Sequence, residues 1–279
     1  MKTSTSRPTI VLVNDDGVHA PGIKALKASL SEIAQVIVVA PLQERSTTGH
    51  TLTLDHTLRM EEIDEHVYGC SGYPADCSLM ALGHLFKNKD SKYRDQKIDL
   101  LISGINRGAN LGQDIFYSGT VAAAREATFH GIPSIAVSSC MDFKTTDKQN
   151  EYYYTASNFI KTLVQSNISK TIPPMTLLNI NVPWCSEAEI NGLKVTKVGF
   201  RKYSEEIDER LDFRGRKYYW IGGIYRGFES FEDSDCLAVE QKMISLSPIK
   251  LTDYGLSKEA LIQELSVFLT TVSSGNQGR

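Results

Sequence analysis

The feature that most constrains the fold is an alternation of short apolar runs with segments of helical periodicity. Residues 9–13 form a β-branched apolar run, which is typical of a strand buried on both faces. Apolar side chains recur at helical spacing in residues 22–33, and residues 36–40 form a second apolar run that ends at Pro41. This order predicts a parallel pair of strands joined by a right-handed crossover.

The alternation continues along the chain. We expect further helices over residues 74–86, 120–130 and 152–165, and further strands over residues 98–103, 132–138 and 177–182. A loop rich in glycine and asparagine is expected over residues 104–119. Strands that alternate with helices predict an α/β fold with a Rossmann-like, doubly wound and mostly parallel sheet.

The pattern changes after about residue 183. We expect strands over 193–200, 217–225 and 243–247 without helices between them, then a closing helix over 256–269 and a disordered tail over 273–279. The chain is therefore divided into an α/β core (1–185), a strand-rich extension (186–250) and a C-terminal helix with a polar tail (251–279). The extension could form a hairpin arm, a β-subdomain or an oligomer interface.

The composition argues against several classes of protein. Lys and Arg total 30 against 33 Asp and Glu, a formal net charge of -3, so neither polymeric nucleic acid nor a membrane surface is expected as a partner. The five cysteines include no Cys-x-x-Cys pair, which disfavours a disulfide framework or a structural zinc site. No apolar run approaches the ~20 residues of a spanning helix. We expect a cytoplasmic protein.

The strongest chemical signal is the run Asn14-Asp15-Asp16-Gly17, directly after the first expected strand. Sites in open α/β sheets form beyond the carboxyl ends of the strands. Two adjacent carboxylates repel each other, and a hard divalent cation would relieve that repulsion. Gly17 permits the turn that lets both side chains reach one ion. The alternative interpretation is a solvated turn.

A second polar segment follows the strand expected at 98–103, and it reads Ser-Gly-Ile-Asn-Arg-Gly-Ala-Asn-Leu-Gly-Gln-Asp over residues 103–114. Its Asn106 and Asn110 offer side-chain oxygens, which suit Mg²⁺ or Mn²⁺. Its glycines let backbone N–H groups approach an anion. Neither a P-loop nor a dinucleotide-binding fingerprint is present. The alternative is an ordinary surface loop.

Two further segments could contact phosphate. Ser118, Gly119 and Thr120 lead into the helix expected at 120–130, where free N–H groups favour an anion, although a simple Ser/Thr cap explains the same residues. Arg45 and Ser46 lie in the loop after the second strand, which should neighbour the two aspartates. The alternative is a polar loop that is merely exposed to solvent. His19 and His50 also fall near the expected site and could assist proton transfer.

These segments, in this order, resemble the survival-protein-E (SurE) family of 5′/3′-nucleotidases. The resemblance rests on Leu-Val-Asn-Asp-Asp-Gly (12–17), Ala-Pro (40–41) with Arg-Ser (45–46), Pro-Ala-Asp-Cys (74–77), Ser-Gly-Ile-Asn-Arg-Gly (103–108), Tyr-Ser-Gly-Thr-Val (117–121) and Leu-Asn-Ile-Asn-Val-Pro (178–183). It runs from about residue 9 to the strand expected at 243–247. Ala122 and Ala127 depart from it, since glycines would be expected there.

The resemblance implies a Rossmann-like core, with the extension serving assembly into a homodimer or homotetramer. It implies one divalent cation, Mg²⁺ or Mn²⁺, held by Asp15, Asp16, Ser46 and Asn106. It also implies hydrolysis of nucleoside monophosphates, with 3′-nucleotidase activity and trimming of short polyphosphate as further activities. For the substrate we expect contacts from Asn14, Arg45, Asn110, Ser118, Gly119 and Thr120.

The predicted reaction is metal-assisted attack of water on the phosphate, with Asp15 and Asp16 as the catalytic carboxylates. The sequence does not distinguish which of them acts as the base. One alternative is a haloacid-dehalogenase-type phosphatase with an aspartyl nucleophile, but that class has Asp-x-Asp where this chain has Asn14-x-Asp16. Another is a nucleotide-sensing module without enzymatic activity.

Overall fold

The computed structural model describes residues 7–94, 96–141 and 151–252 of the 279-residue chain. The described residues up to Ile249 belong to one compact unit, and a second unit begins at Lys250. The closing helix and the tail expected after residue 255 lie outside the described residues. Among the described residues, no helix is long and apolar enough to cross a membrane.

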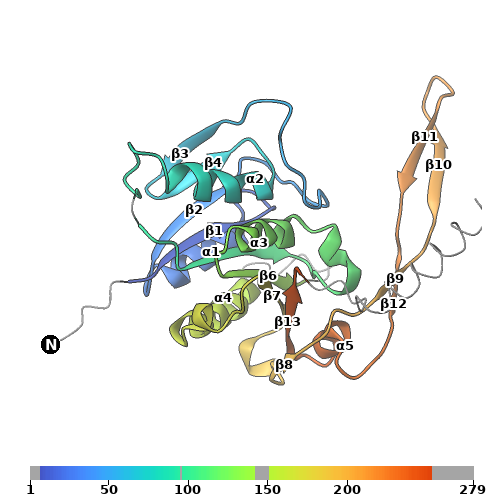
Figure 1. Cartoon of the computed structure of the whole chain (residues 1–279). Coiled ribbons are helices and arrows are strands. Elements are labelled where there is room, and N and C mark those ends of the chain that lie inside the picture. The colour runs from blue at the N-terminus through green and yellow to red at the C-terminus, as the bar shows by residue number, and fades with distance from the viewer. Residues whose placement is uncertain (1–6, 95, 142–150, 253–279) are drawn as a thin grey trace, which may run out of the picture. The chain divides into compact units, whose positions relative to one another are not determined.

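Nine strands form the main sheet (Figure 1). Their order is β3-β4-β2-β1-β5-β6-β7-β13-β8, and their bounds are β1 Thr9–Val13, β2 Gln35–Pro41, β3 Met60–Asp64, β4 Val67–Cys70, β5 Leu100–Arg107, β6 Ser134–Cys140, β7 Thr176–Pro183, β8 Leu193–Val195 and β13 Ile244–Lys250. β4, β2, β1, β5, β6 and β7 pair in parallel, and β3 runs antiparallel to β4. The expected α/β fold with a mostly parallel sheet is confirmed.

Helices connect the parallel strands. Their bounds are α1 Pro21–Leu30, α2 Pro74–Leu79 continued by the π-helix η1 Met80–Leu85, α3 Gly119–Phe129, α4 Glu151–Gln165 and α5 Asp235–Glu240, with short 3₁₀ turns η2 Gly112–Phe116, η3 Ile168–Lys170 and η4 Glu187–Glu189. Proline begins both α1 and α2, where its missing N–H costs no hydrogen bond. Alternate side chains of a strand point to opposite faces, so each strand contributes to two cores.

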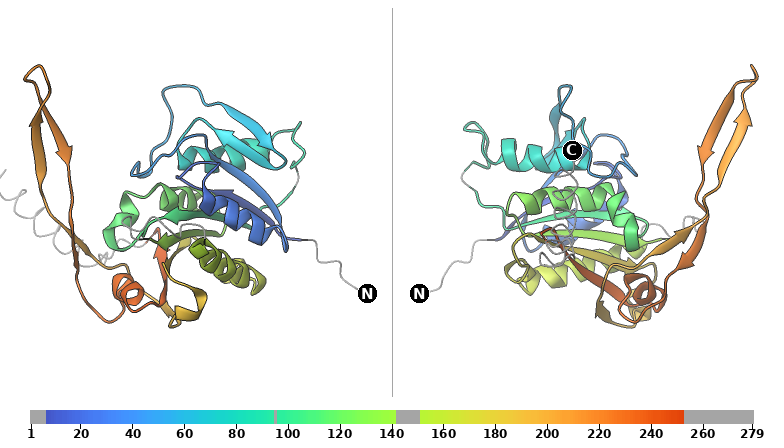
Figure 2. Two further views of the ribbon diagram at one scale, coloured as in Figure 1. Left: turned by 180° about the vertical axis from the view of Figure 1, so that it is seen from behind. Right: turned by 45° about the vertical axis from the view of Figure 1, so that its right-hand side comes forward.

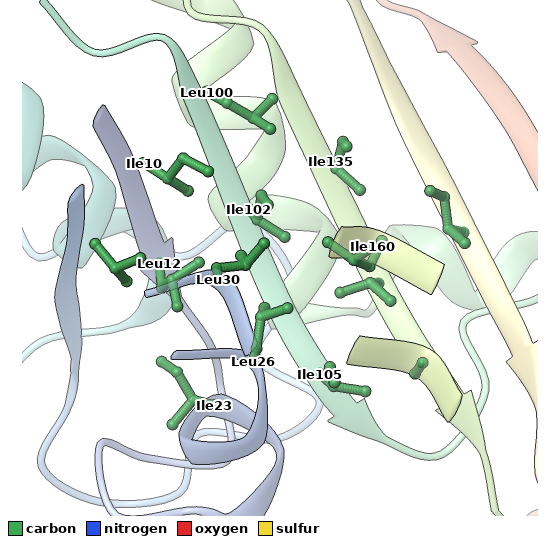
Figure 3. Packing of buried hydrophobic residues seen from close by; sticks show 14 of the residues in the cluster. Ile10, Leu12, Ile23, Leu26, Leu30, Leu100, Ile102, Ile105, Ile135 and Ile160 are labelled. Atoms are coloured by element: carbon green, nitrogen blue, oxygen red, sulfur yellow. The ribbon is translucent and has the colours of Figure 1, made fainter. Parts of the chain in front are cut away.

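The two cores lie on opposite faces of the sheet. α1 and α4 cover one face, where Ile23 of α1 and Ile160 of α4 belong to one buried cluster with Ile10 and Ile102 of the sheet (Figure 3). α2, η1 and α3 cover the other face, where Ala123 of α3 belongs to the same cluster as Val11, Val13 and Leu101. Each buried Leu, Ile or Val side chain stabilises the fold by about 1.5–3 kcal/mol. Both faces of β1 are covered, so the residues that follow it have a fixed starting point.

The chain after residue 185 contributes strands both to the main sheet and to two small separate sheets. β8 and β13 join the main sheet, so that sheet continues across the boundary expected there. β9 Arg201–Tyr203 pairs with β12 Tyr225–Phe228, and β10 Ile207–Leu211 pairs with β11 Lys217–Ile221 in a hairpin whose strand residues are all exposed. Figure 2 shows this hairpin as a ribbon separate from the main sheet. The division into a core and an extension for assembly stays a prediction.

Several expected bounds were wrong. Residues 104–119 are not a continuous loop, because β5 extends to Arg107 and η2 follows at Gly112–Phe116. The strands expected at 193–200 and 217–225 are shorter, and the helix α5 lies between the strands where none was expected. The β3–β4 pair was not anticipated. β3 has the sequence Met-Glu-Glu-Ile-Asp with mostly exposed side chains, which does not resemble a buried strand.

Candidate functional site

The candidate site lies where the strand order reverses. From β1 the parallel strands proceed to β2 and β4 on one side and to β5, β6 and β7 on the other. Ligands of open α/β sheets bind at such a switch point, outside the carboxyl ends of the strands. Asp15 and Asp16 follow β1 directly, and Asn106 lies near the end of the neighbouring β5.

The turn after β1 is fixed by Asn14 and Gly17. Asn14 is fully buried, and its Nδ2 donates to the Gly17 carbonyl at 2.9 Å. Gly17 has φ +102°, a conformation that glycine adopts without a steric penalty. Within the described part of the chain, Asn14 Oδ1 has no hydrogen-bond partner. Asn14, expected as a substrate contact, is therefore placed beneath the turn that orients the two aspartates.

Asp15 is buried against the first turn of α3. It accepts hydrogen bonds from the hydroxyl and from the backbone N–H of Thr120. Gly119 approaches so closely that a Cβ there would lie 2.9 Å from Asp15 Cβ, which excludes any larger residue without movement. Burial raises the pKa of Asp15, although the bonds from Thr120 act in the opposite direction. The expected cation site and the expected phosphate site therefore meet at this carboxylate.

Asp16 lies on the neighbouring side of the same turn. Its Oδ2 accepts the backbone N–H of Arg107, the residue after Asn106, at 3.0 Å. Burial, followed by the charge of Asp15, raises the pKa of Asp16 to about 7. The hydrogen bond to Arg107 brings the ends of β1 and β5 together, and the side-chain Nδ2 of the preceding Asn106 donates to the Gly108 carbonyl at 2.9 Å.

Ser46 is near the two aspartates but its side chain is directed elsewhere. It is exposed, and its Oγ donates to Glu44 Oε1 at 2.8 Å. Glu44 is also exposed, yet its charge contributes to the raised pKa of both Asp15 and Asp16. Glu44 is a carboxylate that sequence reasoning missed. Its signal was its position two residues before Ser46, in a loop already assigned to the site.

Arg45 and Ser118 are engaged by the protein itself. The guanidinium of Arg45 lies 5.1 Å from the ring centre of Tyr73, and its Nη2 donates to the Ser71 carbonyl at 3.3 Å. Ser118 is the N-cap of α3, and its Oγ accepts the N–H of Val121 at 3.1 Å. The helix cap considered for Ser118 is therefore present. The N–H groups of Thr120 and Val121 are already bonded, to Asp15 and to Ser118 Oγ, so in the first turn the N–H of Gly119 is the group left to favour an anion.

Asn110 lies in a buried amide network. Its Nδ2 donates to Ser138 Oγ at 2.8 Å, and its carbonyl accepts the side-chain amides of Asn179 and Asn181 at 2.8 and 2.9 Å. Sequence reasoning gave Asn110 a substrate contact and gave no role to Asn179 and Asn181. Their signal was two asparagines at alternate positions of an otherwise apolar strand, which places both on one face.

The histidines occupy different environments. His19 is exposed, whereas the Nε2 of His50 lies 2.8 Å from Glu126 Oε2. Glu126 is a buried residue of α3 that sequence reasoning did not single out. A glutamate in a run of small helical residues, four positions before His130, was the available signal.

The residues at the switch point fit a hard divalent cation. Among the described residues, no group of three or more His, Cys, Asp or Glu side chains could hold a metal. A cation would therefore be held by the two aspartates together with neutral oxygens, which suits Mg²⁺ or Mn²⁺ better than zinc. The repulsion that raises the pKa of Asp16 is the kind of cost that a cation relieves.

Comparisons with known proteins identify the family of the chain. The family model described as "Survival protein SurE" matches residues 10–205. The "5'-nucleotidase SurE" of Geotalea daltonii is 40% identical over 259 residues, which cover 93% of this chain and 99% of that protein. The chain belongs to the SurE family. The "5'-nucleotidase SurE" of Geobacter sulfurreducens is 43% identical and covers 87% of both chains.

Structural similarity to the SurE family is equally extensive. The crystal structure of the SurE protein from Aquifex aeolicus matches with a TM-score of 0.77 and 36% sequence identity, over 94% of this chain and 99% of that one. The resemblance inferred from the motifs is confirmed at the level of the family. The individual site residues stay predictions.

Proposed function

We propose that this chain is a 5′-nucleotidase that hydrolyses nucleoside monophosphates with the help of a divalent cation. The single observation that carries the proposal is the contact between Asp15 and the N-terminal turn of α3. An anionic phosphate beside two carboxylates would be repelled unless a cation lay between them. Asp15, one of two adjacent carboxylates, contacts the N-terminus of a helix. This contact therefore supports a site that binds both phosphate and metal.

Asp15, Asp16 and Asn106 would hold the cation through their oxygens, and Ser46 would join them after its side chain leaves Glu44. When bound there, a divalent cation would supply positive charge that stabilises the transition state and makes a bound water more acidic. The first turn of α3 would orient the other phosphate oxygens through the N–H of Gly119, and Ser118 and Thr120 would join it once their N–H groups leave Asp114 and Asp15. One of the two aspartates accepts the proton of the water.

Further parts of the proposal follow from the family. 3′-Nucleotidase activity and trimming of short polyphosphate use the same phosphate site and need no additional residues. Assembly as a homodimer or homotetramer would use the extension, where exposed apolar side chains line the β10–β11 hairpin. We expect the protein to act in the cytoplasm, where nucleoside monophosphates are present.

The test is a phosphate-release assay with 5′- and 3′-mononucleotides and short polyphosphate, with EDTA and with added Mn²⁺ or Mg²⁺. We expect turnover of 5′-mononucleotides that EDTA abolishes and a cation restores. Tight nucleotide binding without turnover under any cation would overturn the proposal in favour of a sensing module. A phosphorylated aspartate detected by mass spectrometry would instead support an aspartyl nucleophile.

The substitution that tests the role of the aspartates is Asp16→Asn, which keeps the size of the side chain and removes its charge. We expect a folded protein with at least a hundredfold less activity, because loss of residues that merely support a metal ligand already costs about 10–100-fold. Asp55→Asn is the control, since Asp55 is an exposed carboxylate in the neighbouring loop. Near-normal turnover by Asp16→Asn would contradict the assignment.

A further inference from the structure

The loop between β2 and β3, residues 42–59, carries one expected metal ligand and is attached to the site at its beginning. The backbone N–H of Arg45 donates to the carbonyl of Asp15 at 2.7 Å. The next side chain, Ser46, is exposed and bonded to Glu44. The backbone of the loop is therefore already beside the aspartates, while the side chain that would complete the cation site is not held there.

A second attachment involves His50 and Glu126. The Nε2 of His50 lies 2.8 Å from Glu126 Oε2, and the His50 ring stacks on Phe129 with 5.9 Å between the ring centres. The side chains are 20% and 9% exposed, so water screens this contact only in part. The other oxygen of Glu126 lies 3.1 Å from the Nε2 of His130. One buried carboxylate thus binds an imidazole of the loop and an imidazole of its own helix.

Glu126 is ionised in this arrangement. The hydrogen bond from His50, followed by smaller effects of His130, lowers the pKa of Glu126 despite its burial. An ionised carboxylate only accepts hydrogen bonds, so the Nε2 of His50 carries the proton that it donates. Hydrogen bonds to a charged group are stronger than neutral ones, so this contact is a strong attachment of the loop to α3.

The helix whose Glu126 contacts His50 is α3, and the first turn of α3 forms the proposed phosphate site. At the beginning of α3, Thr120 donates to Asp15, and just before it the carbonyl of Tyr117 accepts the backbone N–H of Gly49 at 2.9 Å. Only residues 46–48 lie between the attachments at Arg45 and Gly49. Because each residue spans at most about 3.6 Å, the position of Ser46 is restricted by both ends of this short segment.

We propose that His50 and Glu126 are positioning residues, whose contact holds the loop against α3 so that Ser46 can complete the cation site. This inference rests on the proposed function, since it assigns a use to the loop in metal binding. It names no new catalytic residue, because neither side chain needs to touch the substrate. His130 binds the same carboxylate but no part of the loop, so it provides a matched control.

The experiment compares His50→Ala, His50→Asn and His130→Ala with the unchanged protein by two measurements. The first is hydrogen exchange of peptides from residues 42–59 in metal-free protein, which requires no activity. The second is the dissociation constant of Mn²⁺, measured by electron paramagnetic resonance without substrate. Circular dichroism establishes that each variant is folded.

For His50→Ala we expect about tenfold faster exchange in the loop and about tenfold weaker Mn²⁺ binding, the scale of losing a group that supports a metal ligand. His50→Asn retains an N–H donor and should recover part of both effects. His130→Ala should leave loop exchange and Mn²⁺ affinity within about twofold of the unchanged protein.

Unchanged loop exchange in His50→Ala would overturn the inference, and so would equal weakening of Mn²⁺ binding by His130→Ala and His50→Ala. Faster loop exchange with unchanged Mn²⁺ affinity would also overturn it, since the loop would then be held without serving the metal. Absence of Mn²⁺ binding in the unchanged protein is a different result. It would contradict the proposed function itself.

Discussion

Asp15 joins two parts of the candidate site that are distant in the sequence. It lies two residues after the end of β1, where the strand order reverses, and it accepts hydrogen bonds from Thr120 in the first turn of α3. Removal of either group would leave a buried polar partner unsatisfied, which costs about 1–3 kcal/mol. The carboxylate therefore contributes to the fold as well as to the proposed chemistry, and substitution of Asp16 is the cleaner test of function.

Glu126 should show a pH-dependent contribution to stability. The hydrogen bond from His50 lowers its pKa below the ordinary value of 4.5, so its stabilising effect is complete above that pH and is lost as the pH falls through the lower folded-state pKa. Glu126→Gln should reduce the free energy of unfolding by about 1–2 kcal/mol at pH 7. Urea denaturation from pH 7 to pH 3.5 measures whether this difference shrinks below pH 4.5.

The exposed Glu205 provides the control for that series, and Glu205→Gln should change stability by less than about 0.5 kcal/mol at every pH. A penalty for Glu126→Gln that stays constant down to the lowest pH would contradict the explanation. It would mean that the shape of the side chain, rather than its charge, stabilises the contact.

The position of the site could be predicted from the sequence, but the direction of individual side chains could not. Asp15 and Asp16 were placed by one rule, that the carboxyl ends of parallel strands gather at one edge. The orientation of Ser46 toward Glu44 depends on loop contacts that no periodicity reports. Asn110 is predicted from the sequence as a substrate contact, and no pattern around it reveals the partners on β6 and β7 that bury its side chain.

At the scale of elements, η2 connects the site to the extension. Gln113 exchanges two hydrogen bonds with the backbone of Arg201, at 2.6 and 2.8 Å. Asp114 Oδ2 lies 2.5 Å from Arg201 Nη1 and accepts the hydroxyl of Tyr203 at 2.6 Å. The guanidinium of Arg201 also lies 4.5 Å from the ring centre of Tyr225. The segment after β5 is therefore fixed by residues from almost ninety positions later in the chain.

Loss of the Asp114 carboxylate should destabilise the protein measurably. Both partners are only about one fifth exposed, so Asp114→Asn leaves the charge of Arg201 poorly compensated, at an expected cost of about 1–3 kcal/mol in urea denaturation. Asp208→Asn is the control, because Asp208 forms an equally short ion pair with Arg210 at an exposed position. That change should cost less than about 1 kcal/mol. Equal effects would contradict the argument from burial.

Helices and strands with one or both faces buried could be predicted from the sequence. Elements whose bounds are determined by tertiary contacts could not. The apolar runs of β1, β2 and β7 and the periodicity of α1 were sufficient. The last residues of β5, Asn106 and Arg107, are polar, and they remain in the strand because β6 pairs with them after a shift in register. α5 has six residues, which is too short for a periodic pattern to emerge.

At the scale of the whole molecule, the topology could be predicted because each crossover has one favoured hand and each helix returns the chain to the same edge. The hairpin could not be placed, since an exposed antiparallel ribbon is not required by any core. Ile207 and Ile221 are paired across it, and they are 63% and 90% exposed. Apolar side chains gathered on an exposed ribbon favour burial against a partner.

We expect the unchanged protein to sediment as a dimer or larger species in analytical ultracentrifugation. The double substitution Ile207→Ser with Ile221→Ser should weaken association at least tenfold, since burial of each isoleucine contributes about 1.5–3 kcal/mol. Asp208→Asn changes the opposite face of the ribbon and should leave the sedimentation unchanged. A monomeric unchanged protein, or an unaffected double variant, would contradict the assignment of the hairpin to assembly.

The attachments of the β2–β3 loop also determine where the chain can change its length. Arg45 and Gly49 are hydrogen-bonded through their backbones, and Thr53 donates from its backbone and hydroxyl to Asp76 at 2.9 and 2.6 Å. Residues 54–57 beyond them are exposed. A short peptide tag inserted after Asp55 would leave the hydrogen bonds of Arg45, Gly49 and Thr53 in place. Deletion of Thr47 alone would shorten the segment between Arg45 and Gly49 and separate Arg45 from the Asp15 carbonyl.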